Sequence, residues 1–148
     1  MKLTHLFLVC TLALAFRLSK AESQFQICAD TLVKGDNNLL CKIRNLEVDG
    51  NMPKAKDFMN CAFEASGWTD KGGQNFKISK LAEDMNAYGY NKQKEVDQVI
   101  KECKAEFGAL ISAIDYLACL LIDESTKKEF KMTLMVKEAD FFKQNFCK

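Results

Sequence analysis

Apolar residues recur every three or four positions along most of the chain, and no stretch alternates apolar and polar residues for long enough to predict a strand. This periodicity predicts an all-α protein. Glycines and capping residues divide the pattern into separate segments. The expected helices cover residues 23–33, a short segment after Asp36, residues 54–66 and 77–88, a segment after Asn91, and residues 109–122 and 126–146.

Single residues mark where several of these helices begin and end. Asp36 and Asn91 can each accept a hydrogen bond from a free backbone N–H, and so cap the helix that follows. Pro53 suits the first turn of a helix, where the missing N–H of proline costs nothing. Gly35 and Gly89 end the helices before them. These signals are local, so they predict helix boundaries without any knowledge of the fold.

The segment 109–122 is the most apolar part of the chain after the N-terminal region, and we expect it to form the central helix. A loop over residues 67–75 is the longest predicted break between helices. The chain of 148 residues has no internal repeat, no low-complexity tract and no linker, and its length corresponds to one domain. The expected fold is a compact helical domain of about six to eight helices.

The first 21 residues have the features of a secretory signal peptide. Lys2 precedes an apolar run over residues 6–16, and small residues, Ser19 and Ala21, occupy the places that signal peptidase requires. The apolar run is too short to span a bilayer, so no membrane anchor is expected. We therefore predict a signal peptide over 1–21, a mature domain over 22–148 and an extracellular protein.

The mature segment contains six cysteines, an even number that predicts three disulfide bonds in a short secreted chain. The pattern alone allows 15 pairings. No two cysteines have the C-x-x-C spacing of a redox or zinc site, so no metal is expected. The cysteines are Cys28, Cys41, Cys61, Cys103, Cys119 and Cys147.

Composition argues against an enzyme and against nucleic-acid binding. His5, the only histidine, lies in the predicted signal peptide, so the mature chain lacks the base of the common hydrolytic triads. Removal of residues 1–21 lowers the count of basic residues from 21 to 18 against 20 acidic ones, which gives a net charge of −2. Arg44 is then the only arginine. We expect no catalytic residue, no cofactor and no nucleic-acid partner.

Aromatic residues are numerous in the mature segment: nine Phe, three Tyr and Trp68, 13 in all. A small helical bundle rarely needs so many rings to fill its centre, and rings commonly line apolar ligand cavities. For any single ring, ordinary packing in the core is nevertheless the more common role. The composition thus favours a protein with an aromatic, mostly apolar ligand cavity.

Three passages carry a resemblance to a known family. Cys41 begins the sequence Cys-Lys-Ile-Arg, Cys61 begins a helix that runs into Gly-Trp-Thr-Asp, and Cys147 lies almost at the C-terminus. In these passages the chain resembles the short salivary proteins of blood-feeding flies known as the D-seven family, a branch of the odorant-binding superfamily. The long gap between the second and third cysteines sets it apart from ordinary insect odorant-binding proteins.

The resemblance implies the disulfide bonds Cys28–Cys61, Cys41–Cys147 and Cys103–Cys119. The pattern of ordinary odorant-binding proteins would instead link Cys41 to Cys119 and Cys103 to Cys147. Both arrangements remain open on the residues alone.

The resemblance also implies a function. Members of the family scavenge small host mediators, such as biogenic amines or eicosanoid-like lipids, and so limit the host's vasoconstriction and platelet responses. The implied ligand-binding residues are Arg44 after the second cysteine, Phe58 in the place of a family histidine, Tyr116 before the fifth cysteine, and Glu138, with Asp140 as the next acidic candidate. Loss of the histidine favours an amphipathic or apolar ligand. The protein is expected to be a monomer.

A second class of function acts through the protein surface, as in an anticoagulant or an inhibitor of the contact pathway. Lysines cluster at 92–94, 101–104 and 127–131 and could meet a polyanion. Neighbouring glutamates make a solvated helix face the simpler interpretation. A carrier of odorant-like apolar ligands is a third possibility.

Overall fold

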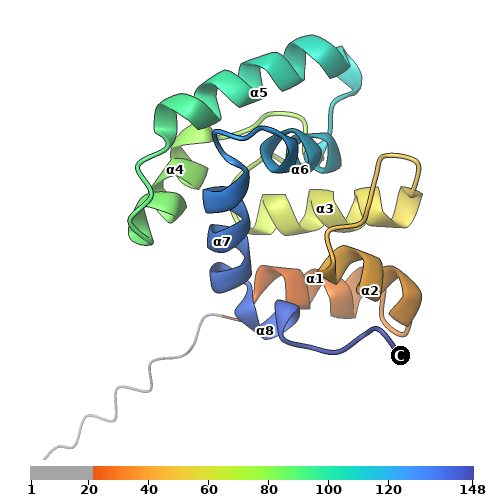
Figure 1. The fold of residues 1–148 in the computed structure, drawn as a ribbon. Coiled ribbons are helices and arrows are strands. Elements are labelled where there is room, and N and C mark those ends of the chain that lie inside the picture. The colour runs from red at the N-terminus through yellow and green to blue at the C-terminus, as the bar shows by residue number, and fades with distance from the viewer. Residues whose placement is uncertain (1–21) are drawn as a thin grey trace, which may run out of the picture.

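The computed structural model describes residues 22–148, and the predicted signal peptide lies outside these residues. The described residues form eight α-helices and one short 3-10 helix, with no strand, which confirms the all-α prediction (Figure 1). The elements are α1 (Gln24–Leu32), α2 (Asn37–Arg44), α3 (Pro53–Ala65), α4 (Ile78–Ala87), α5 (Gln93–Phe107), η1 (Gly108–Leu110), α6 (Ala113–Ile122), α7 (Lys127–Lys137) and α8 (Ala139–Phe142).

The helices are arranged around α3 and α6. Helix α3 packs against α1 on one side and against α6 on the other, and α6 also contacts α5 and α7. Figure 1 shows α5 and α6 at one end of the molecule and α1, α2 and α8 at the other, with α7 running between them. Helix α6 is covered by α3, α5 and α7, whereas α1, α2 and α8 lie at the other end of the molecule. The expectation of a central helix surrounded by all the others is therefore met only in part, and α3 is nearer the middle.

Several helix starts follow the local signals. Ser23 caps α1 and Asp36 caps α2, where the Asp36 carboxylate accepts a hydrogen bond from the Leu39 backbone N–H at 3.1 Å. Pro53 is the first residue of α3, as predicted. The prediction for Asn91 is wrong, because Lys92 occupies the N-cap position of α5 and no side chain caps that helix.

The predicted helix over 109–122 begins four residues later than expected. Residues 108–110 form the 3-10 turn, and α6 starts only at Ala113. The backbone N–H and the hydroxyl of Ser112 both donate to Asp115 Oδ2, at 2.9 and 2.8 Å. These two hydrogen bonds hold the start of α6 at Ser112, whose extended backbone interrupts the helix predicted to run through it.

The predicted helix over 126–146 is divided at Glu138. Helix α7 ends at Lys137, α8 is a single turn, and residues 143–148 are not helical. The Glu138 carboxylate turns toward the start of α1, where it accepts hydrogen bonds from Ser23 Oγ at 2.6 Å and from the Phe25 backbone N–H at 3.1 Å. A contact between residues far apart in the chain thus accompanies the break.

Three disulfide bonds link the helices. They join Cys28 to Cys61, Cys41 to Cys147 and Cys103 to Cys119. These are the pairs that the resemblance implies, and they differ from the pattern of ordinary odorant-binding proteins. The bonds fasten α1 to α3, α2 to the C-terminal segment, and α5 to α6, so each restricts the unfolded chain.

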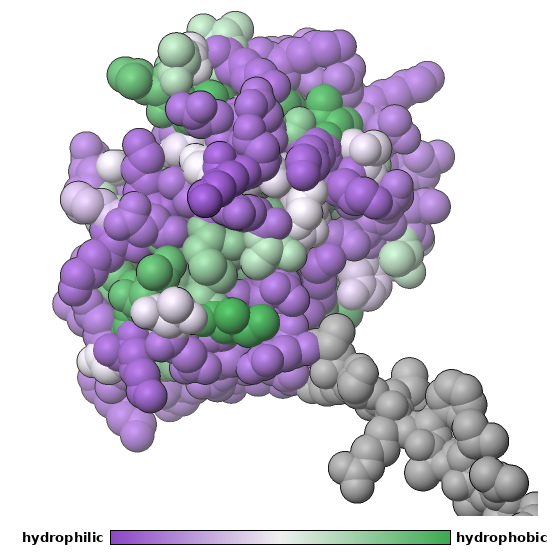
Figure 2. Space-filling model, turned by 180° about the vertical axis from the view of Figure 1, so that it is seen from behind, coloured by the Kyte–Doolittle hydropathy of each residue, from purple (hydrophilic) through white to green (hydrophobic). Residues whose placement is uncertain are grey.

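The aromatic rings pack against one another instead of surrounding an open space. Phe25 contacts the rings of Phe58, Phe141 and Phe142, with ring centroids 5.4–5.6 Å apart. A second cluster contains Phe63, Trp68, Phe76, Tyr116 and Phe130. Most of these rings form the core, which is the more common role expected of any single ring, so few of them can line a cavity. Figure 2 shows that one outer face is mainly hydrophilic, with separate hydrophobic patches.

Candidate functional site

Arg44 ends α2 and lies at the edge of α8. Its Nε donates a hydrogen bond to the backbone carbonyl of Phe142 at 3.2 Å, and the side chain is half-buried. The remaining guanidinium nitrogens have one long contact, from Nη1 to Asn45 Oδ1 at 3.4 Å. Because a guanidinium carries five N–H donors, the group can hold α8 and still donate to a ligand.

Phe58 and Glu138 lie in the same region as Arg44. The Phe25 ring contacts both Phe58 and Phe142, and the Phe25 backbone N–H binds the Glu138 carboxylate. Phe58 is fully buried and Glu138 is only 1% exposed. Phe58 and Glu138 therefore both contact Phe25, and Arg44 is linked to it only through Phe142. Phe58 and Glu138 are core residues with partners inside the protein.

Tyr116 belongs to the other aromatic cluster. Its ring contacts Phe76, and its hydroxyl donates to the backbone carbonyl of Gln74 at 2.6 Å. Burial, with smaller effects from Asp70 and Asp115, raises the pKa of Tyr116 to about 12. The phenol thus stays protonated at neutral pH and fastens the 67–75 loop to α6.

A pocket of about 310 Å³ opens beside Arg44, between the end of α2 and helices α7 and α8. We call it the Arg44 pocket. Its volume lies near the lower end of the roughly 300–1,000 Å³ that is usual for small-molecule sites. The pocket is lined by Arg44, Asn45, Leu46, Glu47, Lys131, Met135 and Phe142.

The backbone at the edge of the Arg44 pocket has an unusual conformation. Leu46 has a φ of 59°, and among the described residues it is the only one besides glycines with a positive φ. Its N–H donates to Ile43 O at 3.0 Å, and the Glu47 N–H donates to Lys42 O at 2.8 Å, which closes the end of α2. This turn usually takes glycine, because a side chain in the left-handed region costs about 1–2 kcal/mol. Such strain is often found next to binding sites.

The pocket combines polar and apolar groups that suit an amphipathic molecule. Arg44 and Lys131 supply positive charge, and Glu47 supplies one negative charge. Met135 and Phe142 offer a thioether and a ring for apolar contact. The sequence indicated Lys131 only as part of a surface lysine cluster and did not indicate Met135 as a ligand contact, although their spacing of four residues places them on one face of a helix.

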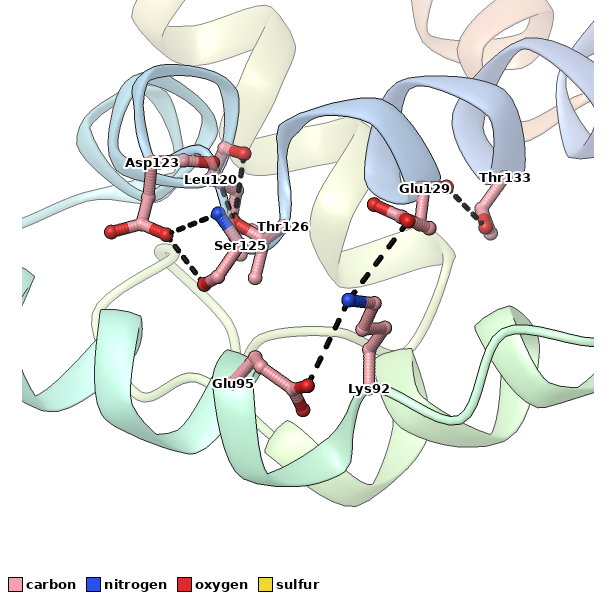
Figure 3. Close-up of polar contacts among 8 residues, drawn as sticks. All are labelled: Lys92, Glu95, Leu120, Asp123, Ser125, Thr126, Glu129 and Thr133. Atoms are coloured by element: carbon pink, nitrogen blue, oxygen red, sulfur yellow. Dashed lines mark hydrogen bonds and ion pairs between the residues drawn. The ribbon is translucent and has the colours of Figure 1, made fainter.

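The lysine clusters are partly neutralised by neighbouring carboxylates. Lys92 lies between Glu95 and Glu129 and so links α5 to α7, at 3.7 and 3.9 Å (Figure 3). Lys101 pairs with Asp97 and Lys127 with Glu124. These pairs reduce the charge that a polyanion would meet.

Over the described range 22–148 no group of side chains could hold a metal ion. Within the same residues, no helix has the length and apolar character needed to cross a membrane.

Comparison with known proteins gives consistent results. The PBP/GOBP family model matches residues 17–122. The chain is 58% identical to the short form salivary protein D7S1 of Aedes aegypti, over 99% of both chains. It is 30% identical to a neutrophil recruitment protein of Aedes aegypti, over 94% of this chain and 96% of that protein. It is also 30% identical to the long form salivary protein D7L1 of Aedes albopictus, over 75% of this chain and 34% of that longer protein.

The match to a salivary protein extends over the whole chain, and the helices and disulfide bonds agree with an odorant-binding architecture. Proteins of this kind bind small ligands and are not catalysts. The chain belongs to the PBP/GOBP (odorant-binding) family and, within it, to the short-form D7 salivary proteins.

Proposed function

We propose that this protein is secreted with saliva and sequesters a small amphipathic mediator of the host in the Arg44 pocket. Biogenic amines and eicosanoid-like lipids are the two classes of mediator that the resemblance implies. The observation that carries the proposal is the pocket itself, in which the only arginine after residue 21 borders a ring and a thioether.

The charges of the pocket favour a ligand with a carboxylate, such as an eicosanoid-like lipid. Arg44 and Lys131 outnumber Glu47, so the head group of the ligand meets a net positive charge. An amine would need a carboxylate that is free to bind its ammonium group. Glu47, the carboxylate that lines the pocket, shares it with two cations, Arg44 and Lys131. The best buried candidate, Glu138, already accepts hydrogen bonds from Ser23 and Phe25.

Titration calorimetry against two sets of mediators tests the proposal. One set contains leukotrienes, thromboxane analogues and fatty acids, and the other contains serotonin, noradrenaline and histamine. We expect a dissociation constant below about one micromolar for a member of the first set, which corresponds to roughly 8 kcal/mol. Binding of amines alone would contradict the preference for a carboxylate, and absence of heat from both sets would contradict the proposal.

The variant Arg44→Ala locates the binding site. We expect it to weaken binding by about 1.5–3 kcal/mol, the usual contribution of a hydrogen bond to a charged group. Lys42→Ala is the matched control, because Lys42 lies on the same helix but does not line the Arg44 pocket. Arg44→Ala also removes the bond to Phe142, so its melting temperature is measured separately. Equal affinities for the two variants would place the ligand elsewhere.

A further inference from the structure

A second groove lies between α5 and α6. Figure 1 shows these two helices at the other end of the molecule from α2 and α8, which border the Arg44 pocket. The volume of the groove is about 200 Å³. Because the Cys103–Cys119 disulfide bond joins the two helices at the groove, its shape is fixed before any partner arrives. We call it the α5–α6 groove. It is lined by Val99, Glu102, Cys103, Glu106, Phe107, Ala118, Cys119, Ile122 and Asp123.

Large apolar side chains project into solvent at this end of the molecule. Ile122 and Phe107 line the groove and are 75% and 41% exposed, and Leu110 in the adjoining 3-10 turn is 85% exposed. Figure 2 shows hydrophobic residues at the upper left, over the end of α5 and the connection that follows it. Neighbouring apolar side chains with this exposure are typical of a surface that binds a partner.

Carboxylates border the same groove. Glu102, Glu106 and Asp123 are all lining residues, and none of them forms an ion pair with another described residue. Asp123 accepts hydrogen bonds from Ser125 through one oxygen only (Figure 3). No basic residue lines the groove, although Lys104 lies on the same helix. An apolar floor with an acidic border is complementary to a partner that carries apolar and basic side chains together.

We propose that the α5–α6 groove docks a cationic amphipathic segment of a partner protein, with apolar side chains on Ile122 and Phe107 and lysine or arginine side chains at the three carboxylates. A membrane is the less suitable partner, because anionic lipid head groups would be repelled by the same carboxylates. This interaction goes beyond the binding of a small mediator and uses a different part of the fold.

Fluorescence anisotropy with two dye-labelled peptides tests the groove. One is an amidated twelve-residue peptide of leucine and lysine, and the other replaces every lysine with glutamate. We expect the lysine peptide to bind at least about tenfold more tightly than the glutamate peptide, because the border of the groove is acidic. Ile122→Ser should weaken binding of the lysine peptide by about tenfold or more, as for a central apolar contact of an interface.

Two further variants make the test specific. Glu106→Lys should weaken binding of the lysine peptide and strengthen binding of the glutamate peptide. Met132→Ser is the matched control, since Met132 is 44% exposed on α7 and lies outside the groove. Equal effects of Ile122→Ser and Met132→Ser, or equal affinity for both peptides, would overturn the proposal. Sedimentation with phosphatidylcholine–phosphatidylserine vesicles that is lost in Ile122→Ser would assign this face to a membrane and would also overturn it.

Discussion

Asp84 connects three parts of the fold through a single carboxylate oxygen. On α4, its Oδ2 accepts hydrogen bonds from the indole N–H of Trp68 at 2.6 Å and from Lys137 Nζ at 2.6 Å. Trp68 is fully buried, whereas the side chains of Asp84 and Lys137 are 28% and 25% exposed. The carboxylate thus holds the loop after α3 and the end of α7 against α4, and its removal leaves a buried N–H without an acceptor.

We expect Asp84→Ala to lower the free energy of unfolding by about 2 kcal/mol. A hydrogen bond to a charged acceptor contributes about 1.5–3 kcal/mol, and the buried indole N–H accounts for most of this. Lys137 adds little, because its partly exposed ammonium group can be solvated by water once the carboxylate is removed. For a domain of this size the melting temperature should fall by roughly 8 °C.

Glu83→Ala is the control for this measurement. Glu83 precedes Asp84 on α4 and forms only an exposed pair with Lys80, which is worth under about 0.5 kcal/mol. Both variants remove one negative charge from the same helix. Urea unfolding followed by fluorescence gives the two free energies, since Trp68 is the only tryptophan. Agreement of Asp84→Ala with Glu83→Ala to within about 0.5 kcal/mol would refute this account of the network.

Three other predictions concern the buried phenol, the buried carboxylate and the disulfide bonds. Because burial raises the pKa of Tyr116 to about 12, the folded protein should lose stability between about pH 10, where an unfolded tyrosine ionises, and pH 12. Tyr116→Phe should reduce this loss in unfolding curves recorded by circular dichroism. Identical pH dependence of the two proteins would contradict the prediction. Glu138→Ala should lower the free energy of unfolding by about 2–3 kcal/mol, since two donors at the start of α1 lose a charged acceptor. A change smaller than about 1 kcal/mol, measured by thermal melting, would contradict this prediction. Alkylation of the unfolded, unreduced mature protein, residues 22–148, should label no cysteine, and peptide mapping should recover Cys41 joined to Cys147. A peptide with Cys41 joined to Cys119 would be the contrary result.

Local chemistry in the sequence determined much of the secondary structure. Ser23, Asp36 and Pro53 mark helix starts because each satisfies, or does without, a backbone N–H within its own turn. The same reasoning failed at Asn91, where Lys92 takes the cap position and no side chain accepts the hydrogen bond. The Cys-Lys-Ile-Arg passage from Cys41 and the spacing of the cysteines indicated the family, because they can be recognised without coordinates.

Tertiary contacts decided the rest. Helix α7 ends beside Glu138, whose carboxylate binds residues more than one hundred positions away, and no local pattern contains that information. The number of rings favoured a cavity and their helical spacing favoured core packing, but whether a given ring faces a ligand or another ring depends on how α1, α3 and α8 pack. Arg44 was evident as a lone arginine, whereas the pocket beside it is completed by Lys131 and Met135 from a helix far along the chain. Neighbouring residues in the sequence determine where helices begin and end, whereas the Arg44 pocket forms only where helices distant in the sequence meet.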